Sequence, residues 1–598
     1  MIFQSGSVTE AQNCSTGSID YSGTLPEVVI NDAITALKSG GSVFIEAGTY
    51  TFTTAINVAG YRSAIGANGV NGVELYGAGN GTILQIGTNL NGAVLTVAYG
   101  SGWSVHDLQI NGNRGSQSDS GESSQYLFGI NFVFGGNDVI EHCYVHDDKS
   151  NGINVYGGTQ DSILDNWVVN SNANGITVDT GSQYTIQGNS VVGASDVGIS
   201  IAGDDTQTGA AGLVTYVTCS GNFVKNINLG VSPYDINSGD GILIGDVGAA
   251  EHVTVTGNTV ENAGSSSSGV GSGIQSYPPS SVTNLDVTIS NNVIYSSPEG
   301  IHIAYTTSAD VSGNTIDGIY SSSSKSAVYI ESSGSGVSIT GNSIENVGTT
   351  NGYGIYNNAN GVAISGNTVS TFTAGAAGIF QNANNGLIQS NTITDVDSDG
   401  GYAVWINNGA SYNTISGNVI TLGHSDSSHI DVAPNALGNV ISGNNLMGAV
   451  TGNCILISSS TVVGTQITGN NFNGRGINAV NDGGRQTVIM NNTGYNPLGH
   501  IASPFVSSGD YVLDQGGVGT PVNATVMTVY ESPKLITVTV GSGWTSAHTL
   551  VIKVDGTQVL STNKPAANTV VFQETLQPGE TFYIQYQTGQ ASFNVSGQ

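Results

Sequence analysis

Four aspartates in the first half of the chain have a spacing that could bring carboxylates together. Each lies four to seven residues after the glycine of a Gly-Ile pair, and they are Asp179, Asp204, Asp205 and Asp246. If every such pair begins an equivalent coil, these side chains meet at one turn on consecutive coils. Two close carboxylates, one protonated and one ionised, are what glycoside hydrolysis requires. Grouped carboxylates also bind Ca²⁺, and aspartate is common in turns for conformational reasons alone, so three interpretations stay open.

A second set of residues follows the isoleucine of each pair by one position. Along the chain this position becomes aromatic and then acidic: His302, Tyr329, Tyr356, Phe380, Trp405 and Asp431. Successive strand residues point to opposite faces, so we expect a row of rings on the outer surface. Aromatic faces bind sugars, and an uncovered row of this size is unusual. Because the local loops are short, we expect a glycan or a second subunit to cover it; strand propensity of aromatic residues is the plainest alternative.

Both sets depend on a repeat that runs through most of the chain. A small residue followed by a β-branched one recurs first every 23 residues and then mostly every 22 to 32, with Gly-Asn pairs between. Each repeat holds short alternating runs of period two and no helical periodicity. Stacked coils of this length place each isoleucine about 4.8 Å from the next and let asparagines form amide ladders at turns. The sequence therefore predicts an all-β protein, a right-handed parallel β-helix.

Changes in this pattern predict the domain organisation. An N-terminal extension (1–24) precedes a capping helix and the first coils (25–128), and the regular β-helix occupies 129–500. After a linker (501–521) the repeat stops. Alternating runs separated by turn residues then predict a small antiparallel β-sandwich over 522–598.

The predicted helix and the strands after it carry a family resemblance. Residues 28–41 have apolar side chains at helical spacing and end in Gly-Gly. The stretch 33–54, followed by GVELYGAGNGTIL at 72–84, resembles the start of the pectate-lyase-like β-helix superfamily, which includes polysaccharide lyases, hydrolases, mannuronan epimerases and phage tailspikes. The epimerases carry Tyr-Gly-x-Asp-Pro-His on an early coil, where this chain reads NGINVY (151–156). The resemblance therefore implies the fold and argues against epimerase chemistry.

Charge and composition limit the partners. The chain has 42 acidic and 11 basic residues, a net charge of −31, so nucleic acid and anionic membranes are disfavoured. No apolar segment is long enough to span a membrane, and the first residues lack the pattern of a secretory signal. The four cysteines are far apart and have no metal-ligand spacing. We expect Cys143, Cys219 and Cys454 to be buried.

These observations favour two functions. The first is an extracellular or virion-surface spike that recognises, and could degrade, host-surface glycans, with a homotrimer or other virion components as partners. The second is a secreted polysaccharide-degrading enzyme, a glycoside hydrolase or lyase. Basic residues near the aspartates are scarce, which disfavours an ordinary polyuronate lyase. No cofactor is required in either case, although Ca²⁺ would suit the aspartates.

Overall fold

The structure is a computed structural model that describes the chain except residues 39, 119–126, 203–211, 228–238, 265–269, 321–324, 349–351, 373–376, 397–400, 423–427, 449–452, 477–478, 496–510, 513–521, 529–533, 541–547, 555–556, 565–569, 577–580, 587–592 and 598. The chain divides into two compact units. One comprises Met1–Gly386 with Val396–Ser398, and the other comprises Leu387–Asp395 with Asp399–Gln598.

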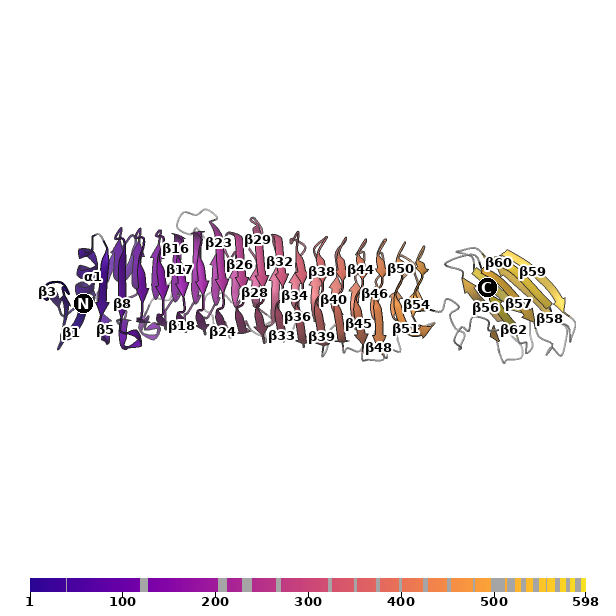
Figure 1. Cartoon of the computed structure of the whole chain (residues 1–598), viewed down its shortest axis with the longest axis horizontal. Helices are drawn as coiled ribbons and strands as arrows, with labels where there is room; N and C mark the ends of the chain where they lie inside the picture. The colour runs from indigo at the N-terminus through magenta and orange to yellow at the C-terminus, as the bar shows by residue number, and fades with distance from the viewer. Residues whose placement is uncertain are drawn as a thin grey trace. The chain divides into compact units, whose positions relative to one another are not determined.

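The first unit is built from coils of three short parallel strands (Figure 1). The first strands are β13 (Ile130–Val133), β16 (Ile153–Thr159), β19 (Ile176–Ser182), β22 (Ile199–Ala202), β25 (Ile242–Ile244), β28 (Ser272–Ser276), β31 (Glu299–Ile303), β34 (Ser326–Ile330), β37 (Tyr353–Asn357) and β40 (Ala377–Gln381). The second strands are β14 (Val139–Glu141), β17 (Ser162–Leu164), β20 (Thr185–Gln187), β23 (Leu213–Ser220), β26 (Ala249–Thr256), β29 (Asn284–Ser290), β32 (Thr306–Ser312), β35 (Ser338–Thr340) and β38 (Ala363–Ser365). The third strands are β12 (Gln109–Asn111), β15 (Tyr144–His146), β18 (Trp167–Val169), β21 (Ser190–Val192), β24 (Phe223–Ile227), β27 (Thr259–Ala263), β30 (Val293–Tyr295), β33 (Thr315–Ile319), β36 (Ser343–Val347) and β39 (Thr368–Phe372).

The isoleucines of the repeat stack in the core, as predicted. Ile153, Ile176 and Ile199 pair in parallel register on successive coils, and Ile242 continues the column. Their side chains are 0 % exposed. Because every coil places a β-branched side chain on the previous one, the hydrophobic core is continuous along the unit.

The asparagines of the Gly-Asn pairs form the expected ladder. In each step one buried amide donates from Nδ2 to the Oδ1 of the next asparagine, as from Asn292 to Asn314 at 3.0 Å and from Asn314 to Asn342 at 2.9 Å. The same Oδ1 also accepts the backbone N–H of the preceding asparagine. The ladder therefore satisfies backbone donors that the turn would otherwise bury unpaired.

The N-terminal end of the stack is closed by one helix and three strands. Helix α1 (Pro26–Ala36) lies where a helix was expected and buries Val29, Ile30 and Ile34. The Glu27 carboxylate accepts the backbone N–H groups of Thr53 at 2.9 Å and Thr54 at 2.6 Å. Strand β1 (Ile2–Ser5) pairs with β2 (Val8–Gln12) and with β4 (Gly41–Ile45), and β2 pairs with β3 (Ile19–Gly23). These elements cover a sheet edge that would otherwise invite association.

The second unit contains further coils and the C-terminal strands. Its first strands are β43 (Tyr402–Ile406), β46 (Ile430–Val432), β49 (Ile455–Ile457) and β52 (Val480–Asp482), and the last coil strand is β54 (Thr493–Tyr495). One C-terminal antiparallel sheet has the order β55 (Tyr511–Val512), β62 (Phe593–Gly597), β57 (Lys534–Val540), β60 (Val570–Leu576). The other has the order β56 (Val522–Thr528), β61 (Thr581–Tyr586), β58 (His548–Val554), β59 (Thr557–Lys564). Their packing as a sandwich stays a prediction.

Two further expectations concern the cysteines and membranes. Cys143, Cys219 and Cys454 are buried, as predicted, and Cys14 is exposed. Among the described residues, no helix has the length and apolar character needed to cross a membrane.

Candidate functional site

The expected row of rings exists on the outer face of the first strands. The rings of His302 and Tyr329 are stacked with centroids 4.8 Å apart, and Tyr329 meets Tyr356 edge-on at 5.0 Å. Tyr356 and Phe380 are 4.8 Å apart. We call Tyr329, Tyr356 and Phe380 the aromatic column. In the second unit Trp405 packs against Tyr402 at 5.4 Å and pairs in register with Asp431.

This row is more covered than the sequence suggested. His302 is 8 % exposed, and Phe380 and Asp431 are each 4 % exposed, whereas Tyr329, Tyr356 and Trp405 are half-buried. A glycan or a second subunit was expected to cover the row, but His302, Phe380 and Asp431 are already buried within the chain itself. Part of the reason is that the chain supplies its own cover, since the ring of Tyr353 lies 4.7 Å from Phe380. The short loops were a poor guide because the covering ring comes from a strand.

The structure describes two of the four predicted aspartates, Asp179 and Asp246. Asp179 is half-buried and pairs in register with Tyr156 and Ala202 on the adjacent coils. Asp246 is exposed just after β25, and Asp204 and Asp205 lie outside the described residues. Between Asp205 and Asp246 the described residues include two regular coil strands, β23 and β24.

The described residues instead show a carboxylate cluster centred on Asp240 and Glu299. Both precede the inward isoleucine of their coil by two positions, and Ser272 occupies the same position on the coil between them. The Ser272 backbone N–H donates to Asp240 Oδ1 at 2.7 Å, and its hydroxyl donates to Glu299 Oε2 at 3.4 Å. With its amide nitrogen turned toward the carboxylate, Gln275 donates to Asp240 Oδ1 at 2.9 Å.

Two cations hold the second carboxylate of this cluster. His302 Nδ1 lies 3.3 Å from Glu299 Oε2, and its Nε2 lies 3.2 Å from Glu331 Oε1. Lys325 Nζ donates to Glu299 Oε2 at 3.4 Å. Because both cations are engaged by carboxylates, the cluster has its positive charge already neutralised.

The environment shifts the pKa values of the two carboxylates in opposite directions. Burial raises the pKa of Asp240 to about 7, against the lowering effect of the Ser272 N–H. Burial also acts to raise the pKa of Glu299, but hydrogen bonds and charges from His302 and Lys325 hold it below its usual value. Burial favours neutral His302, yet its bonds to Glu299 and Glu331 raise its pKa to about 9. Near neutral pH, Asp240 therefore carries a proton in much of the population, beside an ionised Glu299.

Asp431 is a further buried acid on the outer face, in the second unit. Burial raises its pKa to about 7, and its Oδ1 has no hydrogen-bond partner among the described residues. No group of three or more His, Cys, Asp or Glu side chains with the arrangement of a metal site occurs in the part of the chain that the structure describes.

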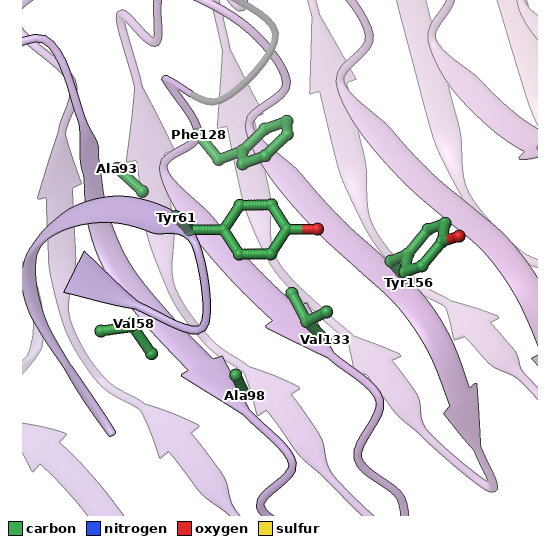
Figure 2. Close-up of a cluster of buried hydrophobic side chains, with 7 residues drawn as sticks. All are labelled: Val58, Tyr61, Ala93, Ala98, Phe128, Val133 and Tyr156. Atoms are coloured by element: carbon green, nitrogen blue, oxygen red, sulfur yellow. The ribbon is translucent and has the colours of Figure 1, made fainter. Parts of the chain in front are cut away.

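The N-terminal coils close this outer face with apolar packing. Figure 2 shows Val58 of β6 (Ile56–Val58) and Tyr61 of β7 (Tyr61–Asn68) beside side chains from β10 (Ala93–Ala98), β13 and β16. The buried members from these coils include Phe128, Val133 and Tyr156. Part of the outer face is thus apolar and covered in these coils, and the carboxylate cluster lies on later ones.

Sequence reasoning missed Asp240 and Glu299, although a signal was present. Both occur as an acidic residue directly before the Gly-Ile pair, in Asp240-Gly241-Ile242 and Glu299-Gly300-Ile301. The residues predicted for the site all follow the pair instead. Of the predicted aspartates, Asp246 contributes to the site electrostatically, because its charge helps to raise the pKa of Asp240.

Comparisons with known proteins agree with the coil geometry. A family model described as "Right handed beta helix region" matches residues 42–212. Sequence comparison with curated proteins finds no match. Similar solved structures include the A-module of mannuronan C-5 epimerase AlgE4 from Azotobacter vinelandii, with 16 % identity, coverage of 73 % of this chain and 95 % of that one, and a TM-score of 0.31.

Two further solved structures are similar at the same level. Pectate lyase Pel9A has 15 % identity, coverage of 48 % of this chain and 71 % of that one, and a TM-score of 0.34. A variant of the tailspike protein of E. coli bacteriophage HK620, in complex with pentasaccharide, has 12 % identity, coverage of 96 % and 89 %, and a TM-score of 0.39. The family model over residues 42–212 and the stacked parallel coils together show a right-handed parallel β-helix.

Proposed function

We propose that this protein binds a neutral polysaccharide on the outer face of its first strands and hydrolyses it at the neighbouring carboxylate cluster. Asp240 serves as the general acid, and ionised Glu299 activates the attacking water. The observation that carries the proposal is the opposite displacement of the two pKa values within one cluster. Pairs of carboxyl groups whose environments separate their pKa values are the usual sign of an acid and a base in glycoside hydrolysis.

The spacing of the coils favours an inverting reaction. Asp240 and Glu299 lie on coils separated by one other coil, so their backbones are about 10 Å apart along the coil axis. Ser272 lies between the two carboxylates and contacts both. Inverting hydrolases keep their carboxyl groups further apart than retaining ones, to leave room for the water.

The charges in the cluster favour an uncharged substrate. His302 and Lys325 are both paired with carboxylates, so neither is free to neutralise a sugar carboxylate. The net charge of −31 also repels polyanions. The aromatic column would hold flanking sugar rings by stacking.

The test is a reducing-end assay on a panel of neutral polysaccharides, with polygalacturonate as the anionic comparison. Glu299→Gln and Asp240→Asn should each lower the rate on the neutral substrate by about 10²–10⁴-fold, the usual contribution of a general acid or base. Asp286→Asn is the matched control, because Asp286 is an exposed aspartate paired with His252 at 3.2 Å on the second strands. Full activity of both cluster variants would exclude this assignment.

Glycan recognition without cleavage is the second candidate, and the aromatic column favours it. Binding of an intact glycan by a wild-type protein that releases no reducing ends would identify this function. In either case the proposed setting is extracellular or on the surface of a particle. The mass of the native protein separates a secreted enzyme, which we expect to be monomeric, from a surface spike, which we expect to be trimeric or particle-bound.

A further inference from the structure

A second surface with the chemistry of a sugar site lies on the third strands. The side chains of Tyr144, Trp167 and Phe223 point outward from β15, β18 and β24, and they share one column with Ser190 of β21 between the last two. Trp167 is 51 % exposed and Phe223 is 36 % exposed. Trp103, by contrast, is 1 % exposed in the core. Single exposed apolar residues are common, but rings aligned on neighbouring coils form a continuous surface.

The rings are held in place by contacts with one another. Tyr144 lies between Trp167 and His146, with centroids 4.9 Å from the first and 4.5 Å from the second. Three coil steps separate Tyr144 from Phe223, a distance of about 14 Å along the axis. This length suits a short oligosaccharide segment better than a single sugar, because each ring can contact a successive unit.

A hydrogen-bonded polar rim fixes the N-terminal end of this surface. His146 Nδ1 donates to Asp147 Oδ2 at 2.8 Å, and its Nε2 accepts from the Gln109 amide at 2.8 Å. The Asn170 amide donates to Asp147 Oδ1 at 3.4 Å, and Arg114 Nη1 donates to the Asn170 carbonyl at 3.0 Å. The rim is thus ordered before any ligand arrives, which reduces the entropy cost of binding.

We propose that Tyr144, Trp167 and Phe223 form a second binding surface for neutral polysaccharide, separate from the carboxylate cluster. Rings beside fixed polar groups suit pyranose sugars, which have an apolar face and an edge of hydroxyl groups. Charge favours this occupant over the alternatives. A second copy of the chain or an anionic glycan would bring negative charge to a protein of net charge −31, whereas a neutral glycan brings none.

The test is affinity electrophoresis in gels that contain a soluble neutral polysaccharide. Three polymers are used: a mixed-linkage β-glucan, a galactomannan and a dextran. The full-length protein carries Glu299→Gln so that the polymers stay intact. We expect retardation on at least one polymer, weakened at least tenfold by Trp167→Ala and only partly by Trp167→Phe. Tyr412→Ala, which removes a ring that is 60 % exposed elsewhere, should change nothing.

Three results would overturn the proposal. These are absence of retardation on all three polymers, unchanged retardation of Trp167→Ala, and a loss of oligomer mass in Trp167→Ala without a change in retardation, which would make the surface a contact between copies. Because Trp167 lies outside the core, a melting curve like that of the parent confirms that the variant is folded. The outcome is independent of whether Asp240 and Glu299 hydrolyse a glycan.

Discussion

Glu299 and His302 form an ion pair, with Oε2 and Nδ1 3.3 Å apart, although their side chains are only 3 % and 10 % exposed. Removing charges from water is costly, so a buried pair is maintained only where further hydrogen bonds support it. Glu331 and Lys325 supply them here. Deleting one member leaves the other charge buried and unpaired, which makes this pair sensitive to both mutation and pH.

The first prediction concerns alkaline pH. The pKa of His302 is raised to about 9 in the folded protein, above its value of about 6.5 in an unfolded chain. The stability that this shift supplies is complete below pH 6.5 and is lost as the pH rises through 9. Melting temperatures should therefore fall between pH 6.5 and 9.5. In His302→Gln the melting temperature should be lower at pH 6 and approach that of wild type at pH 10.

His252→Gln serves as the control for this series, since His252 is a half-exposed histidine that pairs with Asp286. Its melting temperatures should follow the wild-type curve. A constant difference between wild type and His302→Gln at every pH would contradict the prediction.

The second prediction concerns mild acid and rests on buried aspartates. Burial raises the pKa of Asp138 to about 7 and that of Asp161 to about 6, above the unfolded value of about 3.9. Their contribution to stability is complete below pH 3.9 and is lost as the pH rises through 6 to 7. Urea denaturation should therefore give a higher free energy of unfolding at pH 5 than at pH 8.

The double variant Asp138→Asn with Asp161→Asn should flatten this dependence, because an amide does not titrate. Glu299 acts in the opposite direction, since its lowered pKa removes stability as the pH falls below its ordinary value of 4.5. A collapse of the wild-type fold at pH 5 would contradict the prediction.

The sequence predicts the stacked features of this protein well and the site only in part. Isoleucine or valine recurs on successive coils at the position of Ile242, and asparagine recurs at the position of Asn314. The type and spacing of these residues therefore predict the core and the ladder. Asp240 and Glu299 each occur once, and nothing in their spacing shows that Ser272 links them. Burial raises the pKa of Asp240, and the contact with His302 helps to lower that of Glu299. In the sequence, His302 is recognisable only as the start of an aromatic row. A property that depends on side-chain burial cannot be read from a column of residue types.

The third prediction tests the ladder. Asn314 donates from Nδ2 to the Ile289 carbonyl at 2.9 Å and to Asn342, and its Oδ1 accepts from Asn292. Asn314→Ala leaves buried donors and acceptors without partners, each costing about 1–3 kcal/mol. We expect a loss of about 3 kcal/mol or more in the free energy of unfolding by urea. Asn360→Ala, at an exposed turn, should lose less than about 1 kcal/mol; equal losses in the two variants would show that the ladder is not a special source of stability.

The fourth prediction concerns the rings of the outer face. Tyr356 and Trp405 are both half-buried, so each has a ring surface that a sugar or a second subunit can contact. Because Phe380 is covered by Tyr353 and Tyr356, the two partly exposed rings are the better targets. The double variant Tyr356→Ala with Trp405→Ala, which removes one partly exposed ring from each unit, should weaken binding of a neutral polysaccharide by at least tenfold, about 1.4 kcal/mol.

The mass of this double variant in solution shows whether the two rings contact a sugar or a second subunit. Unchanged mass with weaker binding identifies a sugar surface, because loss of stacking area affects the ligand alone. A fall from trimer to monomer identifies a subunit contact, as expected for a surface spike. If neither binding nor mass changes while the melting curve stays that of a folded protein, the rings reflect strand propensity, and recognition on this face must then depend on the carboxylate cluster without them.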